Sequence, residues 1–71
     1  MSNELSTIGQ SIRKQRKKMG ISQDKLSKLT GLSYNTIVKI ESGKNPNPTI
    51  KTLQKIARAL DVSVGQLLSK P

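Results

Sequence analysis

Three side chains near the middle of the sequence have the types and spacing to contact the edges of DNA bases. Asn35, Val38 and Lys39 lie three and four residues apart, so a helix would hold them on one side, opposite Ile37 and Ile40. An amide can pair with adenine, an ammonium group can donate to guanine, and an aliphatic side chain can pack on the thymine methyl group. The stretch therefore predicts a helix that contacts the major groove. The alternatives are a solvated Asn35 and a Lys39 that holds phosphate.

The overall charge favours the same kind of partner. The 71 residues include 13 Lys and Arg against 4 Asp and Glu, which gives a formal net charge of +9. A compact basic domain favours a polyanion, and we expect nucleic acid ahead of an anionic membrane surface. Tyr34 is the only aromatic residue, which argues against RNA-binding sheets that stack bases on several aromatic rings. Tyr34 either fills the core or, from the first turn of its helix, contacts DNA.

Other kinds of chemistry lack the residues that they need. The sequence has no cysteine and no histidine, which excludes disulfides, a thiol nucleophile and ordinary zinc sites. It shows no acid pair at catalytic spacing and no glycine-rich phosphate loop. We therefore expect no enzyme, no cofactor and no metal. No apolar run is long enough for a membrane span, and none resembles a signal peptide, so we expect a cytoplasmic protein without a membrane partner.

Arg16 is a charged residue on an otherwise apolar stripe of the first predicted helix. The apolar members of the stripe are Ile8, Ile12 and Met19. A charge buried there needs a partner. Of the four acidic residues, one lies in a polar N-terminal stretch and two lie near predicted helix starts, which leaves Glu41. We predict a bidentate ion pair between Arg16 and Glu41. The alternative is that Arg16 reaches solvent along the edge of the stripe.

Five short helices are expected to position these side chains, which makes the fold class all-α. Apolar spacing, capping residues and glycine stops place the helices at about 7–19, 23–30, 34–42, 50–60 and 63–68, with Ser6 or Thr7 capping the first. The second and third are expected to be held together by Leu26, Leu29, Leu32, Ile37 and Ile40. The apolar face of the fourth is Leu53, Ile56, Ala57 and Leu60. We expect one domain over residues 1–71 with its core at about 8–68.

The order and spacing of these segments resemble the lambda-repressor-like, Cro/XRE-type helix-turn-helix domains. The resemblance covers about residues 8–68 and is carried by I-R-K-Q-R-K-K-M-G-I-S-Q, L-S-K-L-T-G-L-S, I-V-K-I-E-S-G-K and P-T-I-K-T-L-Q-K-I-A-R-A-L-D-V-S-V-G-Q-L-L. It implies a compact five-helix DNA-binding domain with the helix-turn-helix at helices 2 and 3. The function that it implies is a sequence-specific transcriptional regulator of double-stranded DNA, a repressor or controller protein. The alternative is an antitoxin-type or other protein-interaction module.

The resemblance also implies roles for individual residues. Gln23 matches a glutamine that touches phosphate and braces the start of the recognition helix, and Arg16 and Glu41 match a recurrent buried pair. Together with the exposed side of the third helix, it suggests base contacts from Ser33, Tyr34, Asn35, Val38 and Lys39. The expected phosphate contacts are Ser22, Gln23, Ser42, Lys44 and Asn45. Ser27 and Thr30 stand where the family has alanine and an apolar residue, so we expect their hydroxyls to bond backwards to the helix.

The end of the sequence holds a candidate dimer patch. Proteins of this type usually dimerise to bind two half-sites about one helical turn apart. The patch expected here is Val62, Val64, Leu67 and Leu68. We expect a homodimer, formed in solution or only on DNA. The alternative is that these residues only complete the core of a monomer.

Overall fold

In the computed structural model, the described residues, 7–45 and 47–68, form five α-helices and no strand. The helices are α1 (Thr7–Lys18), α2 (Gln23–Thr30), α3 (Tyr34–Ser42), α4 (Ile50–Ala59) and α5 (Val64–Leu68). The all-α fold class and the five helices are thereby confirmed, with helix ends within one or two residues of those predicted. The cap proposed at Ser6 lies outside the described residues.

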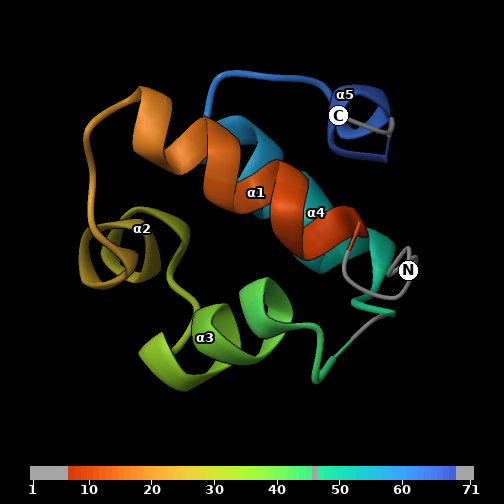
Figure 1. The fold of residues 1–71 in the computed structure, drawn as a ribbon, viewed down its shortest axis with the longest axis horizontal. Helices are drawn as coiled ribbons and strands as arrows, with labels where there is room; N and C mark the ends of the chain where they lie inside the picture. Colours follow the sequence, from red (N-terminus) through yellow and green to blue (C-terminus); the bar gives the residue numbers. More distant parts are fainter. Residues whose placement is uncertain (1–6, 46, 69–71) are drawn as a thin grey trace.

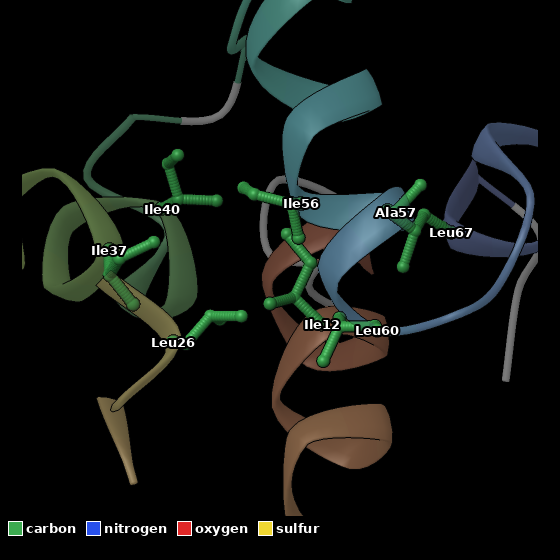
Figure 2. Packing of buried hydrophobic residues seen from close by; sticks show 8 residues of the cluster. All are labelled: Ile12, Leu26, Ile37, Ile40, Ile56, Ala57, Leu60 and Leu67. Atoms are coloured by element: carbon green, nitrogen blue, oxygen red, sulfur yellow. The ribbon is translucent and has the colours of Figure 1, made fainter. Parts of the chain in front are cut away.

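The helices pack around one apolar core. Helix α1 contacts α3 and α5, α4 contacts α2 and α5, and α2 contacts α3, so α1 and α4 lie between the α2–α3 pair and α5 (Figure 1). Figure 2 shows side chains from all five helices meeting in this core. They are Ile12, Leu26, Ile37, Ile40, Ile56, Ala57, Leu60 and Leu67. Full burial of one such isoleucine or leucine contributes about 1.5–3 kcal/mol, so the core fixes the relative positions of the helices.

Two residues expected on the buried side are exposed instead. Leu29 is 49% exposed and Met19 is 46% exposed. Helix α2 turns Leu26 and Ser27 inward, and a residue three positions after Leu26 is rotated by about 300°, which places Leu29 on the flank. Met19 follows the last residue of α1, and it is exposed although its backbone N–H still donates to the carbonyl oxygen of Gln15 at 3.1 Å, so its place on the stripe did not decide its burial. The prediction for both residues is wrong.

The two hydroxyl residues of α2 are satisfied within the helix, as the sequence suggested. Ser27 is buried, and its Oγ donates to the carbonyl oxygen of Asp24 at 2.7 Å. Thr30 Oγ1 donates to the carbonyl oxygen of Leu26 at 2.9 Å. The two hydroxyls therefore replace apolar packing groups without leaving a buried donor unpaired.

A close approach between α1 and α3 depends on Gly9. A Cβ atom at this buried position would lie 2.7 Å from the carbonyl oxygen of Glu41 and still closer to that of Ile40. Real carbon atoms do not approach an oxygen this closely, so only glycine lets α1 pack directly on the backbone of α3. No sequence pattern points to Gly9, because glycine inside a helix is otherwise unfavourable.

The expected dimer patch does not lie wholly on the surface. Leu67 is 0% exposed and belongs to the core, so its inclusion in a surface patch is wrong. Val62 and Val64 are half-buried and pack against the core, whereas Leu68 is 47% exposed. Successive residues of α5 point in different directions, which explains why Leu67 faces inward and Leu68 faces outward.

Candidate nucleic-acid interface

A three-residue turn, residues 31–33, joins α2 to α3. Gly31 has φ 76°, the left-handed conformation that ends α2. Ser33 then starts α3, because its Oγ accepts a hydrogen bond from the backbone N–H of Thr36 at 3.1 Å. Gly43, with φ 86°, ends α3 in the same way. Both ends of α3 are therefore fixed by local backbone chemistry.

One side of α3 is open to solvent. Ile37 and Ile40 are each 1% exposed, whereas Asn35 and Lys39 are exposed. Neither of these two side chains makes a hydrogen bond or ion pair within the described part of the chain, so their donors are free to bind a ligand. Tyr34 is 52% exposed, so the alternative that it fills the core is wrong.

Arg16 and Glu41 form the bidentate ion pair that the sequence predicted. Arg16 Nε donates to Glu41 Oε2 at 2.7 Å, and Nη2 donates to Oε1 at 3.0 Å. Arg16 Nη1 also donates to the carbonyl oxygen of Ile21 at 2.9 Å. The hydrogen bond with Glu41 raises the pKa of Arg16 above its ordinary value. Both side chains are largely buried, so the alternative of a solvated Arg16 is wrong, and the pair ties α1 to α3.

Gln23 joins this ion pair from the first position of α2. Its Nε2 donates to Glu41 Oε1 at 3.1 Å. The resemblance implied a brace at the start of the recognition helix, but Glu41 lies in the last turn of α3. The reason is that Glu41 is turned toward α1 by Arg16, which brings its carboxylate beside the start of α2. An amide nitrogen carries two hydrogens, so Gln23 keeps one for a second acceptor.

The serine residues expected to touch DNA also have structural roles. Ser42 Oγ donates to the carbonyl oxygen of Lys39 at 3.2 Å, which occupies its only hydrogen. Ser33 Oγ shares a 2.8 Å hydrogen bond with Thr36 Oγ1 in addition to its cap. Ser22 Oγ accepts from the backbone N–H of Lys25 at 3.0 Å and keeps its hydrogen. Ser22 can therefore donate to phosphate without giving up a bond that it has, and so can Ser33 when Thr36 Oγ1 is the donor of the bond that they share.

The loop after α3 stays close to the end of that helix. The backbone N–H of Asn45 donates to the carbonyl oxygen of Lys39 at 3.1 Å, and the backbone N–H of Lys44 approaches Ser42 Oγ at 3.4 Å. Lys44 is exposed and Asn45 is half-buried. The structure therefore places these loop residues at the end of α3, and their phosphate contacts stay predictions.

A cleft of about 270 Å³ lies between α1 and α3, next to Gln23. Its lining consists of Arg13, Arg16, Gln23, Val38, Glu41 and Ser42. Val38 is half-buried in the lining of this cleft, whereas Asn35 is exposed. Sequence reasoning missed Arg13, although a signal was present: Arg13 lies three residues before Arg16, and residues at this spacing are neighbours on a helix surface.

The described residues offer no sign of a metal site. Among residues 7–45 and 47–68, no three or more acidic, cysteine or histidine residues cluster in a way that could hold a metal ion. None of the helices in the described part of the chain has the length and apolar character needed to cross a membrane.

Comparison with known sequences identifies relatives of the chain. A model of the helix-turn-helix family matches residues 12–67. The chain is 38% identical over 63 residues to the HTH-type transcriptional regulator SinR of Bacillus subtilis (strain 168), a match that covers 89% of the chain and 57% of SinR. The chain thus spans little more than half the length of this relative.

Solved structures share the fold. The N-terminal DNA binding domain of SinR from Bacillus subtilis is 37% identical with a TM-score of 0.87, covering 92% of the chain and 94% of that domain. C.AhdI, a restriction-modification controller protein from Aeromonas hydrophila, is 33% identical with a TM-score of 0.84, covering 89% of the chain and 94% of that protein. With its capped three-residue turn between α2 and α3 and a family match over residues 12–67, the chain belongs to the helix-turn-helix family.

Proposed function

We propose that the chain is a single DNA-binding domain that regulates transcription by placing α3 in the major groove of a specific double-stranded site. The observation that carries this proposal is the open side of α3. Asn35 and Lys39 extend from it without partners among residues 7–45 and 47–68, while the Arg16–Glu41 ion pair holds the helix in place. The net charge of +9 supports a polyanionic ligand. SinR is a transcriptional regulator and C.AhdI is a restriction-modification controller protein, which supports regulation rather than catalysis.

Each group at the interface has a chemical role in this proposal. Asn35 pairs with an adenine edge, and Lys39 donates to guanine or to a nearby phosphate. The backbone N–H groups at the starts of α2 and α3 face the sugar–phosphate backbone, where the helix dipole favours anions. Gln23 donates its second amide hydrogen to phosphate, and Lys44 adds a charge beside the groove. Base contacts give specificity, whereas phosphate contacts position the domain.

The proposal includes a homodimer that forms at least on DNA. A single domain of this size contacts only a few base pairs, and a dimer would contact two half-sites about 34–36 Å apart. Leu68 is exposed on α5, and the nearby Val62 and Val64 are half-buried. These residues support α5 as the dimer surface. A protein that occupies a promoter keeps other proteins from binding the same DNA. We therefore propose a repressor or controller role in the cytoplasm.

A salt titration tests the proposed function. The purified chain is titrated with random duplex DNA and with the DNA upstream of its own gene at several salt concentrations. We expect a specific site that binds at least about 1,000-fold more tightly than random duplex at physiological salt. The affinity for that site should also fall less steeply with salt than the background. Equal affinity for every duplex would contradict regulation by sequence and favour the protein-interaction module.

A further inference from the structure

The cleft between α1 and α3 carries one charge that nothing in the described structure neutralises. Of its lining residues, Arg13, Arg16 and Glu41 are charged. Arg16 and Glu41 neutralise each other through two hydrogen bonds of 2.7 and 3.0 Å. Arg13 is exposed, and within residues 7–45 and 47–68 it makes no hydrogen bond or ion pair. The cleft therefore presents a net positive charge from a guanidinium group that is free to bind an anion.

The lining of the cleft also includes a neutral donor, Gln23. Gln23 uses one amide hydrogen on Glu41 Oε1 at 3.1 Å, and this bond fixes the direction of the Nε2 atom. The second hydrogen on that atom is unused. A guanidinium fork beside an oriented amide is a favourable environment for a phosphate oxygen. Glu41 does not repel such an anion strongly, because Arg16 compensates its charge.

The position of the cleft indicates which anion it meets. Its opposite wall is Val38 and Ser42, on the side of α3 that the proposed function places in DNA. A helix with its side chains is about 10–12 Å across and fills a major groove about 12 Å wide. The sugar–phosphate strand that borders the groove must then pass along the flank of α3, where α1 and this cleft lie.

We propose that Arg13 and the second amide hydrogen of Gln23 bind one backbone phosphate of the DNA in this cleft. The inference rests on the proposed function and adds α1 to the DNA-binding surface. In this arrangement the Arg16–Glu41 ion pair also sets the position of the phosphate site relative to α3, because the pair fixes α1 against α3. Arg13 contributes affinity for every sequence and no base preference.

The first test compares Arg13→Ala with Lys14→Ala. Lys14 is the neighbouring exposed residue of α1 and does not line the cleft, so both variants lose one charge. We expect Arg13→Ala to weaken binding about tenfold on specific and random duplex alike, and to reduce the slope of log affinity against log salt by about 0.9. Lys14→Ala should weaken binding by no more than about twofold. Equal melting temperatures would show that both variants are folded.

The second test locates the phosphate. Duplexes that carry one uncharged methylphosphonate at a time in the specific site are bound to the wild type and to Arg13→Ala. We expect one position whose penalty is about tenfold in the wild type and clearly smaller in Arg13→Ala, where only the Gln23 hydrogen bond to that phosphate remains. Equal effects of Arg13→Ala and Lys14→Ala, or penalties at every position that persist in Arg13→Ala, would overturn the inference while leaving the proposed function intact. Absence of a specific site for the wild type would overturn both.

Discussion

At the residue scale, the carboxylate of Glu41 joins three parts of the molecule. It accepts two hydrogen bonds from Arg16 of α1 and one from Gln23 of α2 while it belongs to α3 itself. Each oxygen is thereby satisfied, which offsets the cost of removing the charge from water. Helix α3 is held against α1 and α2 through the side chain of Glu41, whereas the exposed Asn35 and Lys39 side chains make no hydrogen bond or ion pair within the described part of the chain.

Loss of one partner from this pair should cost much more stability than loss of an exposed pair. We expect Glu41→Ala to lower the free energy of unfolding by about 3 kcal/mol, because Arg16 would remain buried without a counter-charge. Lys28→Ala is the control, since it removes a 3.2 Å ion pair with Asp24 whose side chains are mostly exposed, and it should cost less than about 1 kcal/mol. Urea unfolding of both variants checks this. Similar losses would contradict a structural role for the buried pair.

The ion pair was predictable from the sequence, whereas the partner of Gln23 was not. Arg16 stood on an apolar stripe, and the chain has only four acidic residues, so elimination left Glu41. The Gln23 contact depends on how α2 is rotated against the last turn of α3, which no local pattern records. The spacing of Arg13 from Arg16 did indicate that the two are neighbours on one helix, but the cleft that they line exists only once three helices are packed.

At the element scale, helix ends followed from local chemistry but helix rotations did not. Ser33 and Thr49 accept backbone hydrogen bonds at the starts of α3 and α4, and caps of this kind can be recognised in a sequence. Leu29 is an example of a helix rotation that the local sequence did not determine. Its spacing from Leu26 is consistent with a buried stripe, but α2 is only eight residues long, so neighbouring helices decide which flank is covered.

Gly9 gives a test of the contact between α1 and α3. Alanine in place of glycine normally stabilises a helix by about 1 kcal/mol. Here we expect Gly9→Ala to destabilise the protein by about 1–3 kcal/mol, because its Cβ would collide with the backbone of α3. The exposed neighbour Gln10 supplies the control, and Gln10→Ala should change stability by less than about 0.5 kcal/mol. Thermal unfolding gives the sign, and a more stable Gly9→Ala would contradict the close packing.

At the scale of the whole molecule, two exposed leucines on different helices allow a test of the proposed dimer surface. Leu68 and Leu29 are 47% and 49% exposed, on α5 and α2. We expect Leu68→Ser to reduce the cooperativity of binding to a duplex with two half-sites and to leave binding to one half-site unchanged. Leu29→Ser should alter neither. Titrations of one-site and two-site duplexes check this, and equal behaviour of the two variants would contradict a dimer through α5.

The most direct test of the proposed function is selection of bound duplexes from a random pool by the wild type, Asn35→Ala and Lys44→Ala. We expect the wild type to select a defined motif. Asn35→Ala should lose the preference at one base pair, a loss of about 1–3 kcal/mol of discrimination. Lys44→Ala should select the unchanged motif with lower affinity. A wild type that selects no motif, or an unchanged motif with Asn35→Ala, would contradict sequence reading by the open side of α3.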